Sequence, residues 1–310
     1  MSVTVVGSIA FDAVRTPFDE RQRMLGGSAV HFALAASFFA AVRVVGPVGD
    51  DFTQAEYEVL HARGVDTTDI ERVPGGRTFF WRGHYDYDLN VAHTDETQLN
   101  VFADFEPKLS PASRDCDVLF LANIQPDLQR SVRRQTNARF VAMDSMNLWI
   151  DTARDALRAT IAEVDCLLLN DAELRMLTGE PSLLRAAREV MRWGPSHVVA
   201  KQGEYGAALF AGDGFFSLPA YPLEAVLDPT GAGDSFAGGF LGYVAAHGAD
   251  SPSEEELRRA MAYGTALASF NVEAFGTERV RNLTAEEITD RVAELRRMTT
   301  FVDAPVALRE

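Results

Sequence analysis

The sequence has little basic charge, few cysteines and no long apolar run. Its 310 residues include 29 Lys and Arg against 45 Asp and Glu, a formal net charge of −16. Such a chain repels a nucleic-acid backbone, so we expect no nucleic-acid partner. No apolar stretch approaches the ~20 residues needed to span a bilayer. The first residues, MSVTVVGSIAFD, lack the basic segment of a signal peptide. We therefore expect a cytoplasmic protein that does not enter a membrane.

Only two cysteines are present, Cys116 and Cys166, and no Cys/His cluster has the spacing of metal ligands. Each of the two begins or precedes an apolar run, DVLFLAN for the first and LLLN for the second. This pattern predicts two buried thiols in neighbouring strands. A disulfide between them is the alternative.

Two common nucleotide-binding motifs are also missing. The chain has no Gly-x4-Gly-Lys-Ser/Thr run, which excludes a P-loop NTPase. The segment VLDPTGAGDSFAGGF contains a Gly-Ala-Gly turn, but Phe236 stands where a dinucleotide fingerprint has its third glycine. This segment also lies far from the first strand. A nucleotide ligand is still compatible with the acidic composition, because loops can hold phosphates through backbone N–H groups and a metal ion.

The chain alternates strand-like and helix-like segments, which predicts a parallel sheet flanked by helices. With 47% apolar residues it can form one large core, and we expect a single domain over residues 1–310. The expected strands include Val3–Val6, Val118–Ala122, Phe140–Met143, Cys166–Leu169 and Val198–Lys201. The expected helices include Asp151–Val164, Asp171–Val190, Gly233–His247, Ser253–Asn271 and Ala285–Met298. Gly212-Asp213-Gly214 predicts an antiparallel hairpin.

Two segments interrupt this alternation. Residues Gly75–Phe105 are rich in aromatic side chains with polar residues between them, and they show no helical period. Residues Asp12–Met24 are polar and turn-prone. We expect both segments to form a small sheet outside the main one.

The Gly-Ala-Gly turn predicts an anion site. We expect a strand over Ala225–Leu227, then the turn, then a helix starting near Gly233. Free N–H groups at a helix N-terminus point outward and carry partial positive charge. Asp234, in the first turn, is either a partner of the helix dipole or a general base beside the anion site. Thr230 is either the N-cap of the helix, a phosphate contact, or both.

Five stretches together resemble the PfkB, or ribokinase-like, carbohydrate kinases. The longest is DPTGAGDSFAGGF, which matches over thirteen consecutive positions, and the others are VGSIAFD, LGGSAVHFALAAS, LLLNDAELRMLTG and VVAKQGEYGA. The resemblance covers essentially the whole chain in order. It implies an α/β fold, a three-layer αβα sandwich with a central, mostly parallel sheet. It also implies a small β-sheet lid, formed by segments of about 12–24 and 75–105, that excludes water from the site.

The resemblance implies roles in phosphoryl transfer and nucleotide binding. Asp234 is expected to be the catalytic base, and the backbone amides of Gly231, Ala232 and Gly233 are expected to form the anion hole for the γ-phosphoryl group. ATP is the implied co-substrate. The residues expected to contact it are Thr230, Lys201, Gly203 and Asn271.

Metal ions are implied as well. Asn170 and Glu173 match an Asn-x-x-Glu motif expected to act on Mg²⁺, through its water molecules, because Mg²⁺ keeps several of them. Without the other motifs, a helix capping box is the favoured interpretation of this pair. Asp228 and Thr230 lie where some family members hold a monovalent cation, and use of K⁺ stays open.

The acceptor site carries a departure from the family pattern. Asp12 and Gly27 are expected to contact the phosphate acceptor, although Asp12 could also be an ordinary turn residue. Where the family usually has a sugar-binding Asn, this chain has His31, which either is structural or reshapes the acceptor pocket. Ser28 replaces a larger polar residue of ribokinases proper. Both changes argue against ribose as the simple substrate.

The aromatic residues of the second lid segment have two interpretations. In a strand, Phe79, Trp81 and Tyr85 would share one face, and Phe80 and His84 the other. They could form the core of a homodimer through the lid, or a platform on which a base stacks. The sequence does not decide between the two.

The leading functional prediction is ATP-dependent phosphorylation of a hydroxymethyl group on a small sugar or sugar-like molecule. A nucleoside such as adenosine, inosine, guanosine or cytidine is the alternative acceptor. A catalytically silent member that senses a ligand is a different class, and the intact Asp234, Asn170 and Glu173 argue against it.

Overall fold

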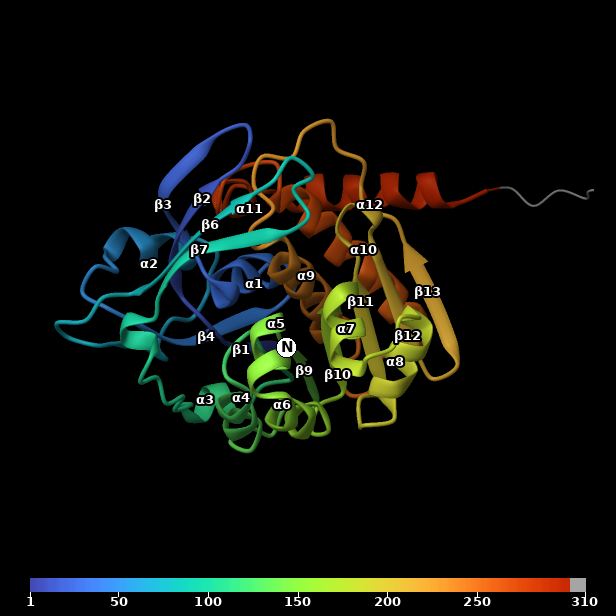
Figure 1. Ribbon diagram of the computed structural model, residues 1–310, viewed down its shortest axis with the longest axis horizontal. Coiled ribbons are helices and arrows are strands. Elements are labelled where there is room, and N and C mark those ends of the chain that lie inside the picture. Colours follow the sequence, from blue (N-terminus) through green and yellow to red (C-terminus); the bar gives the residue numbers. More distant parts are fainter. Residues whose placement is uncertain (302–310) are drawn as a thin grey trace, which may run out of the picture.

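A sheet of nine strands forms the middle layer of the protein (Figure 1). A computed structural model describes residues 1–301, so the last nine residues of the predicted domain lie outside the described part. The strand order is β13-β12-β11-β10-β9-β8-β1-β4-β5, and all neighbours are parallel except at β12 and β13. The strands are β1 (Ser2–Val6), β4 (Ala41–Val48), β5 (Ile70–Arg72), β8 (Val118–Leu121), β9 (Phe140–Asp144), β10 (Cys166–Asn170), β11 (His197–Lys201), β12 (Ala207–Ala211) and β13 (Gly214–Leu218).

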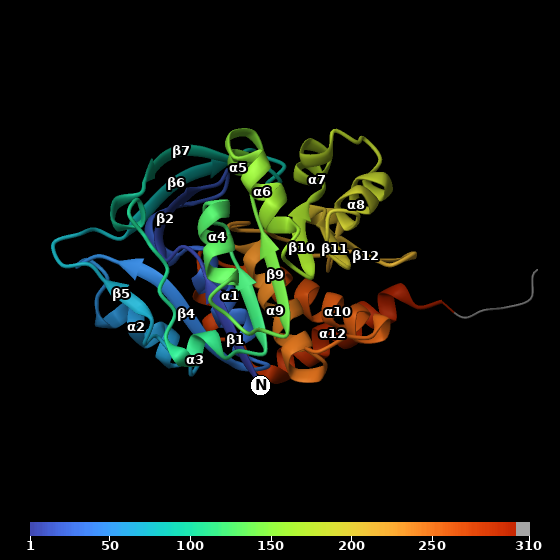
Figure 2. The ribbon, with the colours of Figure 1, turned by 90° about the horizontal axis from the view of Figure 1, so that it is seen from below.

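Alternating side chains of these strands enter two separate cores. Leu168 and Val199 lie in one apolar cluster, whereas their neighbours Leu167 and Val198 lie in the other. Helices therefore cover both faces of the sheet, and Figure 2 shows the two sets on opposite sides. One set is α1 (Ser28–Ala36), α2 (Gln54–His61), α9 (Ala232–His247), α10 (Glu254–Asn271), α11 (Glu278–Arg281) and α12 (Ala285–Thr299). The other set is α4 (Pro126–Arg133), α5 (Asn147–Thr152), α6 (Arg154–Ile161), α7 (Asp171–Thr178) and α8 (Leu183–Met191), with short α3 (Pro111–Arg114) at its edge. The predicted three-layer α/β fold is confirmed.

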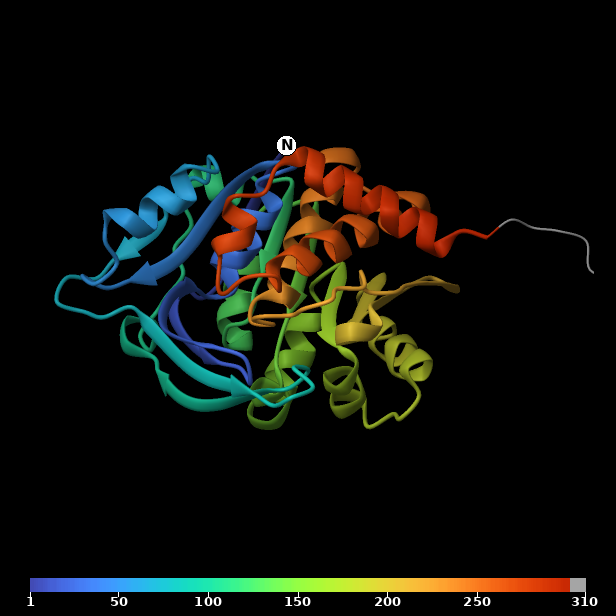
Figure 3. The same ribbon diagram turned by 90° about the horizontal axis from the view of Figure 1, so that it is seen from above.

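A second sheet of four strands, which we call the lid, lies apart from α10 and α12 (Figure 3). Its order is β3-β2-β6-β7. The strands are β2 (Ala10–Arg15), β3 (Glu20–Gly26), β6 (Phe79–Tyr85) and β7 (Ala92–Gln98). The two segments predicted to leave the main sheet thus pair with each other, and β2 and β6 are joined in parallel.

The aromatic side chains of β6 pack within this chain. Phe79 lies against Phe102, with ring centroids 5.5 Å apart, and Phe80 packs on the core between the main sheet and α1. Trp81 and Tyr85 join a cluster with Phe275. The exposed aromatic residues of the lid lie instead in its loops. Neither predicted use of these side chains is tested by these contacts, and a dimer through the lid stays a prediction.

Several predicted boundaries are wrong for local reasons. The helix predicted over Asp151–Val164 is two helices, α5 and α6, divided at Ala153 where φ is −140°. The helix predicted over Asp171–Val190 is also two, because Gly179 adopts a left-handed conformation that ends α7, and a proline follows shortly after. No strand forms over Ala225–Leu227: the segment between β13 and α9 is irregular, and the Leu227 N–H donates to the Val272 carbonyl instead of to a strand.

Both cysteines are buried free thiols. They do not lie in neighbouring strands as predicted: Cys166 begins β10, Cys116 precedes β8, and β9 lies between those strands. Among the described residues, no helix has the length and apolarity that a membrane crossing needs.

Candidate active site

The Gly-Ala-Gly turn begins helix α9 in a conformation that only glycine adopts readily. Gly231 is the N-cap residue, with φ 76°, and none of the described side chains caps the helix there. A Cβ atom at Gly231 would overlap the imidazole of His31, and one at Gly233 would lie 2.8 Å from Lys201 Nζ. A side chain at Gly231 would therefore displace the His31 ring, whereas one at Gly233 would require only the flexible end of Lys201 to move.

The three amides of the turn are not equivalent. The Ala232 N–H donates to the Pro229 carbonyl at 3.2 Å. In the described part of the chain, the amides of Gly231 and Gly233 have no hydrogen-bond acceptor. These two N–H groups, at the positive end of a sixteen-residue helix, are the ones available to an anion.

Asp234 follows immediately, in the first turn of α9. Burial raises the pKa of its carboxyl group to about 6, and the nearby Lys201 ammonium opposes that rise. A carboxyl with a pKa near 6 is largely ionised at neutral pH and is still a better proton acceptor than an ordinary aspartate.

Two buried aspartates lie close to the half-buried Asp234. Burial, together with the charges of Asp228 and Asp234, raises the pKa of Asp12 to about 7, although the Gly27 amide opposes this. Asp228 is fully buried, and its two oxygens accept the N–H groups of Thr230 and Gly276, each at 2.9 Å. Asp228 thus fixes the shape of the turn, whereas Asp12 projects from the lid strand β2 into the same acidic region.

Three parallel strands end in polar residues at one edge of the sheet. β9, β10 and β11 end at Asp144, Asn170 and Lys201, and these strands are neighbours. Asp144 is buried, its Oδ1 has no partner among the described residues, and burial raises its pKa while Lys201 opposes the rise. Asp144 is not among the site residues predicted from the sequence. Its signal was available, since it follows the apolar run FVAM as Asn170 follows CLLL.

Asn170 and Glu173 form the capping box of α7. Asn170 Oδ1 accepts the Glu173 N–H at 2.7 Å, and Glu173 Oε2 accepts the Asn170 N–H at 2.9 Å. The box also holds the Glu173 carboxylate near Lys201. Burial raises the pKa of Glu173, and the Lys201 charge opposes that rise. The two interpretations of this motif are therefore compatible.

A cavity of about 860 Å³ opens on one side of the Gly-Ala-Gly turn, a size typical of small-molecule sites. Its walls come from Gly203, the irregular segment before the turn, Ala232, and one face of α10. Asn90, at the tip of the lid, closes part of it through a 3.4 Å hydrogen bond to Glu204. Of the four residues predicted to contact the nucleotide, only Gly203 lines this cavity.

Asn271, another of those four, contacts the turn from inside the protein. Its side chain is fully buried; Nδ2 donates to the Thr230 carbonyl at 2.7 Å, and Oδ1 contacts Ser235 and His31 at 3.0 Å each. These contacts hold the turn, and a contact between Asn271 and the nucleotide stays a prediction. Thr230 is not the helix N-cap as one interpretation had it, because Gly231 takes that position.

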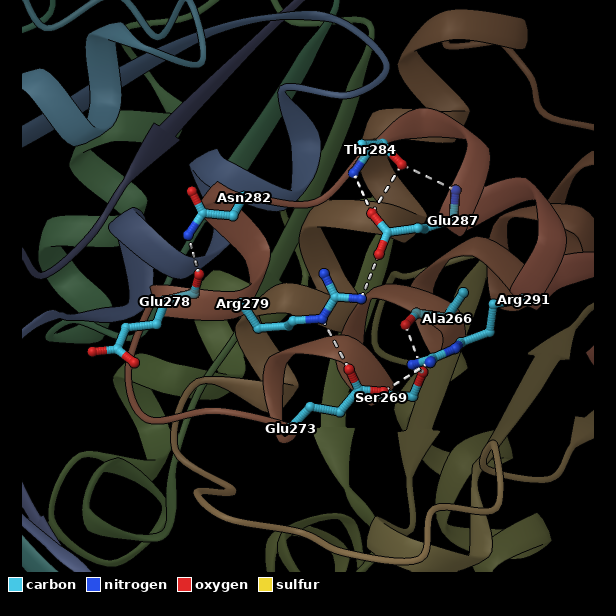
Figure 4. A network of polar contacts seen from close by, with 9 residues as sticks. All are labelled: Ala266, Ser269, Glu273, Glu278, Arg279, Asn282, Thr284, Glu287 and Arg291. Atoms are coloured by element: carbon cyan, nitrogen blue, oxygen red, sulfur yellow. Dashed lines mark hydrogen bonds and ion pairs between the residues drawn. The ribbon is translucent and has the colours of Figure 1, made fainter.

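A polar network supports the α10 wall of the cavity (Figure 4). Arg291 donates to the hydroxyl of Ser269, which lines the cavity, and pairs with Glu273 at 2.7 Å. Arg279 joins the same Glu273, at 2.9 Å, to Glu287 of α12, at 2.7 Å. Linked charges of this kind fix the wall to the last helix more firmly than single surface pairs do.

The lid also reaches the turn directly. The Tyr85 hydroxyl, at the end of β6, lies 3.1 Å from Thr230 Oγ1. Tyr85 is 8% exposed. This contact joins residues 145 positions apart, and no sequence signal pointed to it.

Comparison with known proteins agrees with this geometry. The sequence pattern of the pfkB family carbohydrate kinases matches residues 2–283. A cytidine kinase of Thermococcus kodakarensis is 29% identical over 265 residues, covering 83% of this chain and 92% of that protein. A nucleoside kinase of Methanothermobacter thermautotrophicus is 28% identical over 291 residues, 88% of this chain and 90% of that protein. The crystal structure of Methanocaldococcus jannaschii nucleoside kinase superposes with a TM-score of 0.77 at 19% identity, covering 94% of this chain and 98% of that one.

The match to the family spans nearly the whole described chain and includes the lid, the sheet edge and the Gly-Ala-Gly turn. The chain therefore belongs to the pfkB family of carbohydrate kinases, and it is an ATP-dependent kinase.

Proposed function

We propose that this kinase transfers the γ-phosphoryl group of ATP to the hydroxymethyl group of a nucleoside. The transfer chemistry is supported by Asp234, a half-buried carboxylate in the first turn of α9. It lies next to two amides that have no acceptor among the described residues. The two relatives described above, named cytidine kinase and nucleoside kinase, support a nucleoside acceptor and match over more than four-fifths of the chain. A small sugar is the second candidate, which the carbohydrate-kinase family favours.

Each group in the site has a distinct task. Asp234 accepts the proton of the acceptor hydroxyl as its oxygen attacks the γ-phosphorus. The Gly231 and Gly233 amides and the Lys201 ammonium stabilise charge on the phosphoryl oxygens, and the bond to the β-phosphate oxygen breaks. Phosphoryl transfer needs mainly such positioning and charge neutralisation. Asp12 and Gly27 orient the acceptor, and Thr230 and Gly203 orient the nucleotide.

The acidic residues at the sheet edge suit Mg²⁺ bound through water. The described residues contain no cluster of three side chains with the spacing of direct metal ligands. However, the charges of Asp234 and Glu173 add to the burial that raises the pKa of Asp144, and the Lys201 ammonium opposes the rise at all three carboxyl groups. Mg²⁺ keeps several water ligands and binds substrate phosphates, so Asn170, Glu173 and Asp144 would hold it from outside its water shell. When bound, it neutralises phosphate charge. A monovalent cation at Asp228 stays a prediction.

We propose that residues 10–26 and 79–98 act as a lid on one catalytic unit. Asp12 lies on lid strand β2, and Tyr85 joins lid strand β6 to the turn. The side chain that orients the acceptor and the surface that excludes water from it thus belong to the same small sheet.

The proposal is tested by measuring ADP release from Mg-ATP with a matched set of acceptors. The set contains cytidine, inosine, adenosine, ribose and 2-deoxyribose, with 5′-deoxyadenosine as the control that lacks the attacking oxygen. We expect turnover with at least one nucleoside, and a kcat/KM at least about tenfold lower with the free sugars. We expect no turnover with the control, because binding energy cannot replace a missing reactive group. Turnover with a free sugar alone would support the second candidate and reject the nucleoside.

A further inference from the structure

His31 and Asn271 meet in the interior, next to the turn that carries the free amides. His31 belongs to the first turns of α1 and is 2% exposed, and Asn271 is the last residue of α10. His31 Nδ1 lies 3.0 Å from Asn271 Oδ1, although the two residues are 240 positions apart. No motif of the sequence linked them.

The hydrogen bonds around Asn271 determine where the histidine carries its proton. Asn271 contacts the carbonyl of Thr230, so the atom facing that carbonyl must be the amide nitrogen, which donates. The amide oxygen then faces both Ser235 and His31, and both must donate to it. His31 is therefore protonated on Nδ1. Its Nε2 is a buried acceptor with no partner in the described part of the chain.

The pair joins the two halves of the site. Four positions before His31 lies Gly27, whose φ of 92° and close approach to the Ser8 carbonyl admit no side chain. On the other side, the imidazole occupies the space that a Cβ at Gly231 would need. Asn271 holds the carbonyl of Thr230, the residue before Gly231. The His31–Asn271 pair thus connects the start of α1, on the acceptor side, with Thr230 and Gly231 at the start of the Gly-Ala-Gly turn.

We propose that the His31–Asn271 bridge is a positioning device that holds the Gly231 amide in the orientation needed for the transferring phosphoryl group. The inference rests on the proposed function, and it assigns to His31 a role other than substrate contact. The bridge acts through the turn, so it stabilises the transition state without contacting the acceptor. Its loss should lower kcat and leave ground-state binding largely unchanged.

Two substitutions of His31 separate this role from mere filling of space. His31→Leu fills a similar space with an apolar side chain and removes the Nδ1 donor. His31→Asn places an amide nitrogen near the former position of Nδ1 and restores the donor. We expect His31→Leu to lower kcat at least tenfold with both KM values within threefold, and His31→Asn to recover most of kcat, because a lost transition-state donor costs about 10²–10³ in rate and a displaced one costs less.

The kinetic results for the two His31 variants either support or overturn the proposed bridge. A rise in acceptor KM at unchanged kcat in both variants would show that His31 binds the acceptor, and would overturn the proposal. Equal loss of kcat in two folded variants would also overturn it. If His31→Leu does not fold, His31→Asn decides: near-wild-type kcat supports the bridge and a tenfold loss rejects it. A wild type with no kinase activity would reject the proposed function itself.

A second measurement does not depend on activity. In ¹⁵N-histidine NMR of the protein without substrates, we expect the spectrum at pH 7 to contain a neutral, Nδ1-protonated histidine whose signal disappears in His31→Asn. An imidazolium or an Nε2-protonated ring at His31 would contradict the arrangement from which the bridge is inferred. An Asn271→Asp variant should shift this signal, because the change adds a charge directly opposite Nδ1.

Discussion

Replacing Asp234 by asparagine is expected to lower kcat by about 10²–10⁴, the usual effect of removing a general base. The substitution keeps the size of the side chain and removes a half-buried charge, so we expect the variant to fold and to bind ATP. The measurement is steady-state turnover on the best acceptor, with the ATP dissociation constant and the thermal midpoint measured on the same preparation. Near-full turnover in a folded variant would show that Asp234 is not the base.

The pH dependence of kcat/KM in the wild type and in Asp234→Asn tests whether Asp234 must be ionised for turnover. Burial raises the pKa of Asp234 to about 6, and a base must be ionised to accept a proton. The kcat/KM of the wild type should therefore rise as pH increases through about 6, because this ratio reports groups of the free enzyme. Asp12, with a pKa raised to about 7, should add a second inflection. In Asp234→Asn one inflection should vanish, and the remaining Asp12 inflection should move to lower pH, because the charge of Asp234 helps to raise the pKa of Asp12. Two inflections in the variant would contradict the assignment.

A Gly231→Ala substitution is expected to reduce kcat by about 10²–10³, the effect of losing one oxyanion donor. Two causes combine. An alanine in the left-handed backbone conformation costs about 1–2 kcal/mol. Its Cβ would also overlap the His31 imidazole, so the turn must move. Movement of the turn displaces the Gly231 amide from the anion site. The measurements are kcat, both KM values and the free energy of unfolding.

Gly179→Ala is the matched control for this substitution. Gly179 has a φ of 71°, close to the 76° of Gly231, but a Cβ there would meet no atom of residues 1–301 within 4 Å. It ends α7, away from the turn. We expect the control to lose about 1–2 kcal/mol of stability for its backbone conformation and to keep kcat within twofold. Equal loss of kcat in both variants would mean that Gly231 matters only for stability.

The sequence predicts the layers of this fold because they depend on local patterns. Buried strands such as Cys166–Asn170 have continuous apolar runs, and the hairpin at Gly212 has the turn residues that it needs. The thirteen-residue motif ending at Phe240 locates the phosphate turn for the same reason, since glycine and aspartate at fixed spacing are a local signal. Interruptions inside a helical pattern, as at Ala153, are harder to predict because tertiary packing decides them.

The site is predicted less completely, because it is assembled from distant parts of the chain. Asp144 gains its position only when β9 lies beside β10. Tyr85 meets Thr230 only when the lid folds over the turn. His31 was recognised as a departure from the family pattern. Its partner Asn271 could not be identified, because the contact depends on how α1, α9 and α10 pack together.

The transfer of a labelled phosphoryl group tests the central claim most directly. The purified protein is incubated with Mg²⁺, ATP labelled at the γ-phosphate and the acceptor found in the nucleoside panel, beside an Asp234→Asn sample. The account predicts that the label appears in a phosphate monoester of the acceptor hydroxymethyl group, in equal amount to the ADP formed, and at least a hundredfold more slowly in the variant, as expected for a lost base (about 10²–10⁴). Label recovered only as inorganic phosphate, or equal transfer by the variant, would contradict it.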